Sequence, residues 1–312
     1  MKNMNENYHI PVLYNEVLDN LITNKDGIYI DCTLGGGGHS EGILKSISEM
    51  GKLISIDQDE NAINFSKKRL EKYQSKWSVY KNNFENLDVP LYMGGIDKVD
   101  GILMDIGVSS EQLDDAYRGF SYKYDSRLDM RMDQNNSLSA YDVVNNYSEE
   151  QLSKIIFEYG EERHARKIAK LICFERKKNK IETTLQLVAI IKRAYTERSS
   201  KHPAKKTFQA IRMEVNRELE VLEIAIKKGV DLLKPGGRIA VITFHSLEDR
   251  LVKNLFRDLA STCNCPPGLP ICVCGVIPKI KLITKKPIIP QDEELKNNNR
   301  AHSSKLRIAE RI

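Results

Sequence analysis

The sequence lacks a membrane span, an export signal and a disulfide framework. No apolar run approaches the roughly 20 residues that a helix needs to cross a bilayer, so we expect no membrane partner. Residues 1–8 are polar and Asn-rich, with no apolar segment behind a basic one, which argues against secretion. Six cysteines in 312 residues are too few for a disulfide scaffold. We therefore expect a cytoplasmic protein whose cysteines are thiols or metal ligands.

The composition is otherwise that of a folded protein. The chain is 41% hydrophobic and 29% charged, which is enough apolar material for a packed core. Its length suits two domains better than one.

Positive charge is concentrated in one segment. Residues 161–213 contain 15 Lys or Arg and 5 Asp or Glu, a local charge of +10 in a chain of +5 overall. An acidic remainder that carries a basic segment favours a polyanion partner. Basic side chains that only solvate helices would give the same count, so the charge leaves both interpretations open.

Two kinds of local pattern divide the chain. Short β-branched runs alternate with helical stretches over the first 110 residues, which predicts a parallel sheet covered by helices. Residues 148–233 show only helical signals. The expected strands are 28–32, 52–57, 77–80, 99–104, 238–244 and 304–311, and the expected helices include 148–160, 161–178, 183–195, 204–233 and 246–259. This predicts an α/β Rossmann-like domain formed by residues 1–112 and 214–312. A helical, basic insertion domain (113–213) would lie between its fourth and fifth strands.

A cluster of four glycines follows the first expected strand. Residues 31–40 read DCTLGGGGHS, a turn that lets the backbone approach a ligand closely. Ile43 stands where a phosphate-binding P-loop needs Lys, and Ser40 stands where a dinucleotide fingerprint needs Gly or Ala. S-adenosylmethionine has a ribose but no pyrophosphate, so it requires neither spacing. An ordinary Gly-rich loop between a strand and a helix remains the alternative.

Acidic residues end three of the expected strands: Asp31, Asp57 and Asp105. The carboxyl ends of parallel strands meet at one edge of a sheet, where ligands bind. Asp57 lies 22 residues after Gly35, a position from which a carboxylate can accept ribose hydroxyls. The alternative is that each acid caps a helix.

The sequence resembles the bacterial 16S ribosomal RNA cytosine N4-methyltransferases, the ribosomal small-subunit RNA methyltransferase H family. The matching runs occur in order along essentially the whole chain. They are HIPVL (9–13), DCTLGGGGHS (31–40), DIGVSS (105–110), QLDD (112–115), RGFS (118–121), LDMRMD (128–133), YGEER (159–163), HPA (202–204), TFQA (207–210), FHSLEDR (244–250) and SSKLRIAER (303–311). Two departures are DSRL at 125–128, where the family usually has Asp-Gly-Pro-Leu, and His302, where Arg is common.

The resemblance implies a class I methyltransferase fold, S-adenosylmethionine as methyl donor and a cytidine of the 16S decoding region as acceptor. The partner would be 16S ribosomal RNA within the small ribosomal subunit. By position, the family's cofactor contacts fall on Gly37, Gly38, His39, Asp57, Phe84, Asp105 and Gln112.

Two residues are candidates for contact with the reacting amine. Asp105 could accept a hydrogen bond from it or could contact the cofactor. His245, after the fifth strand, could reach the target base, or its ring could be satisfied by nearby backbone. Residues 105–110 and 243–246 contain no cysteine, which argues against methylation of a ring carbon through a thiolate. The alternatives are an amine methyltransferase that acts on DNA and a non-catalytic RNA-binding ribosome assembly factor.

Four of the cysteines form a compact pattern, Cys263-x-Cys265 and Cys272-x-Cys274. Four thiolates suit a structural zinc, although their one-residue spacers are shorter than the usual two to four. Reduced or redox-sensitive thiols are the alternative. We identify no metal ligands for catalysis.

Overall fold

The computed structural model describes residues 11–107, 118–195, 202–263, 265, 274–298 and 300–312. The chain divides into two compact units. The first unit is Met1–Gly107 with Leu219–Ile312, and the second unit is Val108–Glu218.

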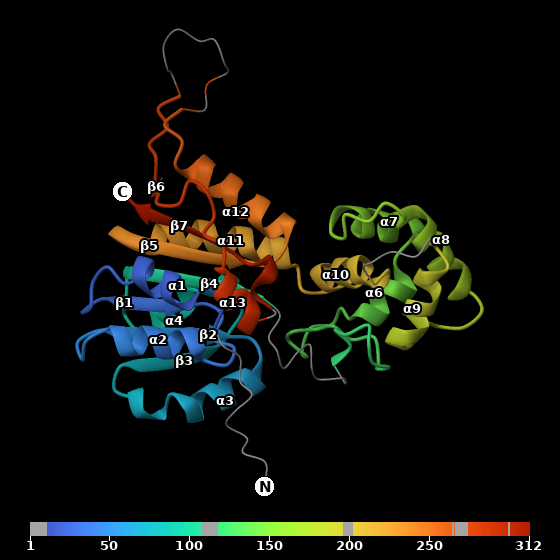
Figure 1. Ribbon diagram of the computed structural model, residues 1–312, viewed down its shortest axis with the longest axis horizontal. Helices are drawn as coiled ribbons and strands as arrows, with labels where there is room; N and C mark the ends of the chain where they lie inside the picture. The colour runs from blue at the N-terminus through green and yellow to red at the C-terminus, as the bar shows by residue number, and fades with distance from the viewer. Residues whose placement is uncertain (1–10, 108–117, 196–201, 264, 266–273, 299) are drawn as a thin grey trace. The chain divides into compact units, whose positions relative to one another are not determined.

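The first unit is built on a seven-stranded sheet in the order β3-β2-β1-β4-β5-β7-β6 (Figure 1). The strands are β1 (Ile28–Asp31), β2 (Lys52–Asp57), β3 (Trp77–Lys81), β4 (Val99–Ile106), β5 (Leu233–Thr243), β6 (Ile280–Leu282) and β7 (Lys305–Arg311). Strands β1 to β5 are parallel, and β7 runs antiparallel to both β5 and β6. The predicted α/β sheet is confirmed, and the helical second unit interrupts its sequence between β4 and β5.

The central strands are apolar because both of their faces are covered. Along β4, Ile102 and Met104 face one core while Leu103 faces the other. Helices α4 (Asp88–Met93), α11 (Glu218–Leu232) and α12 (Ser246–Leu259) cover the first face through Leu91, Ile226 and Phe256, among others. Helices α1 (Tyr14–Leu21), α2 (Gly38–Ser46) and α3 (Glu60–Arg69) cover the second. The short helix α13 (Asp292–Asn297) precedes β7.

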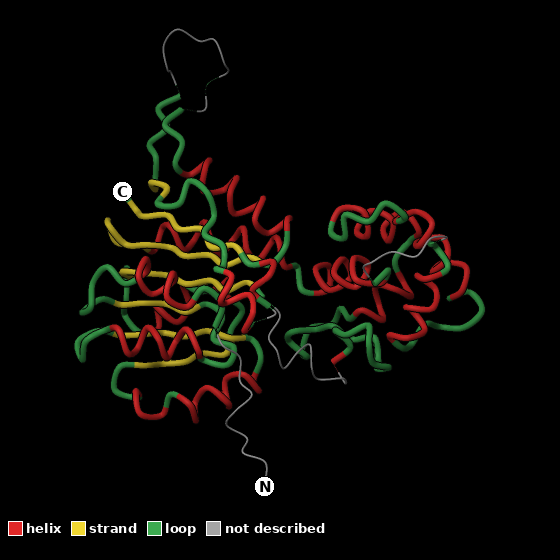
Figure 2. Tube along the Cα trace, viewed as in Figure 1, coloured by secondary structure: helices red, strands yellow, loops and turns green. Residues whose placement is uncertain are grey.

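Figure 2 shows the second unit as helices joined by loops, with no strand in its described part. Its helices are α6 (Ala140–Asn146), α7 (Glu149–Glu158), α8 (Ala165–Glu175), α9 (Thr184–Lys192) and α10 (Ala204–Val215). Capping boxes at Ser139, Ser148 and Thr183 begin three of them, because each side chain accepts the backbone N–H three residues on. The helix start expected at Ser148 is confirmed.

The helix expected over residues 204–233 is wrong as a single element. It breaks between Val215 and Glu218, where Arg217 has a φ of +50°. No glycine or proline marks this break. The Asn216 side chain instead donates to the carbonyl of Met130 and accepts the N–H of Met132, so a contact distant in sequence ends α10.

Two strand expectations also needed correction. Strand β5 begins at Leu233 and not at Arg238, because its pairing with β4 jumps from Val99↔Leu233 to Gly101↔Arg238. Pro235 and its two following glycines therefore lie in an irregularity within the strand, not before it. Strand β6 was not expected, since three residues are too few to show a period.

Candidate functional site

The three acids predicted at strand ends lie on adjacent strands of the sheet, β2, β1 and β4. The two acids on β1 and β2 do not cap the helices that follow them. The residue that caps α2 is Gly37, and the residue that caps α3 is Asp59, whose side chain accepts the N–H of Asn61. For Asp31 and Asp57 the capping alternative is therefore wrong.

Asp31 is fully buried, and its carboxylate accepts hydrogen bonds from residues at both ends of the glycine turn. Its carboxylate accepts the Ser40 hydroxyl at 2.6 Å and the backbone N–H of Thr33 at 3.1 Å. The Ser40 hydroxyl also lies 2.8 Å from that of Ser55, which accepts the indole N–H of Trp77. Burial raises the pKa of Asp31 against the opposing effect of Ser40. Because Asp31 is fully buried, we interpret it as a residue that positions the turn, a role that the sequence pattern did not distinguish from ligand contact.

Asp57 is half-buried at the carboxyl end of β2. One carboxylate oxygen accepts the N–H of Gly35 and the other accepts that of Asp59, both at 2.8 Å. Each oxygen has a second lone pair, so the carboxylate can still accept two hydroxyls. Burial raises the pKa of Asp57 to about 6, although the two backbone N–H groups act in the opposite direction.

Asp105, near the end of β4, pairs with His39 at the start of α2. His39 Nδ1 lies 3.5 Å from Asp105 Oδ2, and His39 Nε2 donates to the Val12 carbonyl at 3.1 Å. Burial alone would lower the pKa of His39, but the carboxylates of Asp105 and Asp31 outweigh it and raise that pKa. Asp105 Oδ1 is buried and has no hydrogen-bond partner among the described residues. A buried carboxylate oxygen in this state can accept a hydrogen bond from a ligand.

The turn between β1 and α2 contains backbone conformations that favour glycine. Gly35 and Gly37 have φ values of +47° and +74°, which other residues rarely adopt. Two side chains of helix α3 stabilise this turn by hydrogen bonds. Ser66 donates to the Gly35 carbonyl, and Arg69 donates to the Gly36 carbonyl. Arg69 also pairs with Glu41 of α2 at 2.9 Å. The sequence did not predict these hydrogen bonds and this ion pair, since neither Ser66 nor Arg69 belongs to a recognisable motif.

Gly38 permits the close approach of the N-terminal segment to α2. A Cβ on Gly38 would lie 2.4 Å from Pro11 Cγ. We expect Gly38→Ala to lower the free energy of unfolding by about 1–2 kcal/mol, because the clash exceeds the gain in helix propensity. Urea denaturation measures the effect. Adding Pro11→Ala should restore most of the loss, and a double variant no more stable than Gly38→Ala would disprove this cause.

The other predicted cofactor contacts are only partly placed. Phe84 begins a short 3-10 helix (Phe84–Asn86), is half-buried and packs against the core that contains Leu91. Gln112 lies outside the described residues.

His245 follows β5 and caps α12. Its Nδ1 accepts the N–H of Glu248 at 3.4 Å, while its Nε2 lies 2.9 Å from Glu248 Oε1 without hydrogen-bond alignment. Glu248 is 2% exposed and also accepts the N–H of Phe244 at 2.8 Å. The ring is thus held partly by backbone, as the alternative interpretation of His245 expected. Strand β5 pairs with β4 up to Ile106↔Thr243, so His245 and Asp105 belong to adjacent strand ends.

Six basic side chains of the predicted insertion are exposed in the second unit. We call Arg163, Arg166, Lys167, Lys170, Lys205 and Lys206 the basic set. Lys206 Nζ donates to the Glu161 carbonyl at 2.7 Å, which ties the start of α10 to the segment before α8.

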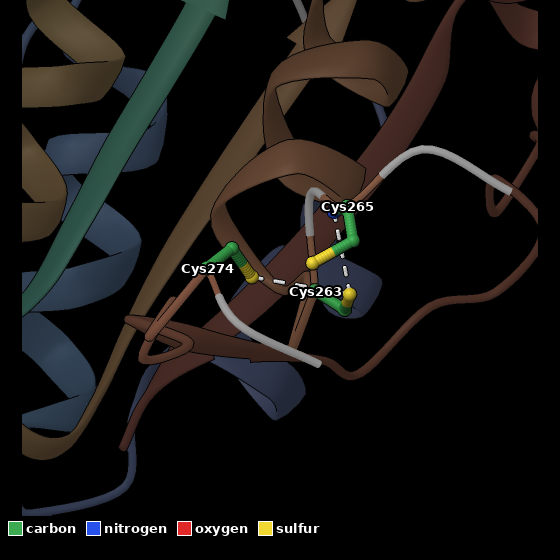
Figure 3. A group of neighbouring side chains, drawn as sticks. All are labelled: Cys263, Cys265 and Cys274. Atoms are coloured by element: carbon green, nitrogen blue, oxygen red, sulfur yellow. Dashed lines mark hydrogen bonds between the residues drawn. The ribbon is translucent and has the colours of Figure 1, made fainter. Parts of the chain in front are cut away.

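The three described cysteines of the C-terminal pattern lie together. Their sulfur atoms are all within 4.8 Å of one another, and Figure 3 shows the side chains of Cys263, Cys265 and Cys274 clustered in one loop region. Cys272 lies outside the described residues.

None of the helices in the described ranges has the length and apolar content to span a bilayer.

The chain matches the MraW methylase family over residues 6–312. It is 72% identical over 312 residues to a protein of Fusobacterium nucleatum subsp. nucleatum named ribosomal RNA small subunit methyltransferase H, covering 100% of this chain and 99% of that one. Proteins of the same name from Clostridium botulinum strain 657 and Clostridioides difficile strain 630 are 56% and 52% identical. They cover 97% and 98% of this chain, and the matches span 99% and 100% of those proteins. On these matches the chain belongs to the MraW methylase family and is a methyltransferase.

Proposed function

We propose that this chain methylates the exocyclic N4 amine of a cytidine in the decoding region of 16S ribosomal RNA, with S-adenosylmethionine as donor. The observation that carries the proposal is the near full-length similarity to proteins named ribosomal RNA small subunit methyltransferase H. The choice of base and atom rests on the motifs of the sequence.

The strand ends suit S-adenosylmethionine. Asp57 retains lone pairs for ribose hydroxyls, and Asp105 Oδ1 is a buried acceptor that receives no hydrogen bond from the described residues. Gly35 and Gly37 form the tight turn after β1 that close contact between a ligand and the backbone would need. We infer that Gly37, Gly38, His39, Asp57, Phe84 and Asp105 hold the cofactor, and that Gln112 joins them. When bound, S-adenosylmethionine supplies a methyl group activated by its sulfonium.

The cofactor contact of Asp57 should depend on pH. Below its pKa of about 6 the carboxyl carries a proton and loses the charge that strengthens its bonds to hydroxyls. We expect affinity for S-adenosylmethionine to be constant above pH 7 and to fall towards pH 5, by up to about tenfold per pH unit. Calorimetric titration across this range measures it.

Asp57→Asn serves as the control for this pH dependence, because its amide does not titrate. It should bind more weakly at pH 7.5 and show a flatter profile below it. Wild-type affinity that stays the same from pH 7.5 to pH 5 would refute the assignment.

The chain's own groups would supply the acceptor for the amine. The cytosine amine is a poor nucleophile because its lone pair is delocalised into the ring, and it must lose a proton as it is methylated. Asp105, one oxygen of which has no partner in the described part of the chain, is our candidate to accept a hydrogen bond from that amine or to contact the cofactor. His245 is the second candidate, from the neighbouring strand end. Holding amine and methyl group in line would provide most of the acceleration.

We further propose that the second unit binds the RNA substrate, within the small ribosomal subunit, through phosphate contacts of the basic set. Exposed Lys and Arg position nucleic acid by its backbone without reading its sequence.

One experiment tests the proposal against its alternatives. The full chain is incubated with methyl-labelled S-adenosylmethionine and, separately, with 16S ribosomal RNA, small ribosomal subunits and DNA, and the products are digested to nucleosides. We expect label in N4-methylcytidine from the ribosomal RNA or the subunits. Label in DNA alone would support the DNA enzyme, and RNA binding without any transfer would support an assembly factor.

A further inference from the structure

The cysteines near the C-terminus are not explained by packing. A cysteine outside a disulfide is among the most buried residue types in proteins. Here Cys263 is exposed and Cys265 and Cys274 are only half-buried, yet their sulfur atoms approach to within 4.8 Å of one another. We call these three residues the thiol cluster. None of the hydrophobic clusters formed by the described residues contains these thiols, so packing within the described part of the loop does not account for their convergence.

The separation of the sulfur atoms fits ligands that share one ion. Zinc–sulfur bonds of about 2.3 Å at tetrahedral angles place two sulfurs about 3.8 Å apart. Cys263 Sγ and Cys274 Sγ are 3.9 Å apart, and Figure 3 shows the Cys265 sulfur beside them. The N–H of Cys265 points at Cys263 Sγ, 3.4 Å away. Such an N–H group stabilises the negative charge of a thiolate ligand.

The loop that carries the thiol cluster leaves the sheet away from the methyltransferase site. It joins α12 to β6, and its base is tied where Lys279 N donates to the Leu259 carbonyl at 2.8 Å. Strand β6 pairs with the end of β7 that lies beside Arg238, the middle residue of β5. His245 lies beyond the carboxyl end of β5, seven residues further along the chain. An ion in this loop would therefore be structural.

We propose that Cys263, Cys265 and Cys274 bind one zinc ion as thiolates. Soft sulfur ligands select zinc over the harder divalent cations, and a zinc ion would cross-link the two ends of the loop. A tetrahedral ion takes a fourth ligand, and Cys272 continues the sequence pattern but lies outside the described residues. The proposal rests on the three described thiols and is independent of the proposed RNA substrate.

Metal content of the intact chain tests the proposal. The wild type and the variants Cys263→Ser, Cys265→Ser and Cys274→Ser are purified under reducing conditions without added metal, and zinc is measured by mass spectrometry. We expect about one zinc per chain in the wild type and less than about a tenth of that in each variant. Cys173→Ser is the matched control: it removes a half-buried thiol of the second unit and should keep the zinc.

A second measurement keeps the test valid if a variant does not fold. Cobalt added to the metal-free wild type should give the intense visible bands of tetrahedral thiolate coordination, and zinc should abolish them. A reduced wild type that holds no zinc and gives no such bands would overturn the proposal, as would a disulfide linking Cys263 to Cys274 in the protein as isolated. Loss of methyl transfer in a folded Cys263→Ser chain with normal RNA binding would contradict the structural role.

Discussion

Replacing Asp57 by alanine is expected to weaken binding of S-adenosylmethionine by about 10- to 100-fold with little loss of fold. A carboxylate that accepts ribose hydroxyls forms charge-assisted hydrogen bonds worth about 1.5–3 kcal/mol. The carboxylate also accepts the N–H groups of Gly35 and Asp59, so its removal loosens the glycine turn as well. Both effects act on the cofactor and neither opens the hydrophobic core.

The measurement is calorimetric titration at pH 8, where the Asp57 carboxylate is ionised. Asp59→Asn is the matched control, because it removes the same charge two residues away while an asparagine still caps α3. The control should bind S-adenosylmethionine as the wild type does, and circular dichroism should show both variants folded. A folded Asp57→Ala chain of unchanged affinity would exclude Asp57 from the cofactor contacts.

Neutralising the basic set is expected to weaken RNA binding broadly and to flatten its salt dependence. The change is glutamine at Arg163, Arg166, Lys167, Lys170, Lys205 and Lys206, all of which are exposed. Removing one ion pair with a phosphate of single-stranded RNA lowers the slope of log affinity against log salt by about 0.7, so removing one at every position of the set would lower it by about 4. Near physiological salt the affinity should fall by orders of magnitude.

The separate effects of the basic-set variant on KM for RNA and on kcat give a second readout. Phosphate contacts hold the RNA equally in the ground and transition states, so the variant should raise KM for RNA more than it lowers kcat. Affinity for S-adenosylmethionine should stay the same, because no member of the basic set is among its proposed contacts, which apart from Gln112 belong to the first unit.

A control of equal charge separates local contact from overall charge. Glutamine at six exposed lysines of the first unit removes the same formal charge, and it should leave the salt slope close to that of the wild type. These lysines are Lys25, Lys67, Lys68, Lys253, Lys285 and Lys286. If the basic-set variant keeps its RNA affinity and slope, the charge is only a solvated helix surface and the RNA contacts lie elsewhere.

Local sequence patterns were sufficient for most of the first unit. The expected strands at 28–32, 52–57 and 99–104 correspond to β1, β2 and β4, because strands buried on both faces are continuous apolar runs. Acidic residues at strand ends were visible for the same reason, since each interrupts the apolar run at its end. Short or irregular elements, such as β6 and the start of β5, were not predicted from the sequence. The break at Asn216 depends on Met130 and Met132, which lie more than 80 residues away.

The roles of the site residues depended on contacts that no local pattern encodes. Asp31 and Asp57 look alike in sequence, and each accepts one hydrogen bond on either carboxylate oxygen. They differ in exposure, because Asp31 is fully buried whereas Asp57 is half-buried and open to a ligand. The pairing of His39 with Asp105 joins the start of α2 to the end of β4. Contact of these residues with the cofactor, and of His245 with the target base, stays a prediction.

By itself, then, the sequence determined the class of sheet, the turn at the end of β1 and the segment that carries the positive charge. Each follows from residues within one element, where hydrophobic period and glycine content act locally. Only the tertiary structure decided which carboxylate oxygen has no partner among the described residues, which acid is fully buried and that three surface thiols converge. Those outcomes depend on hydrogen bonds and distances between elements far apart in the chain. The pKa of Asp57 is another such outcome, because burial in the folded chain raises it to about 6.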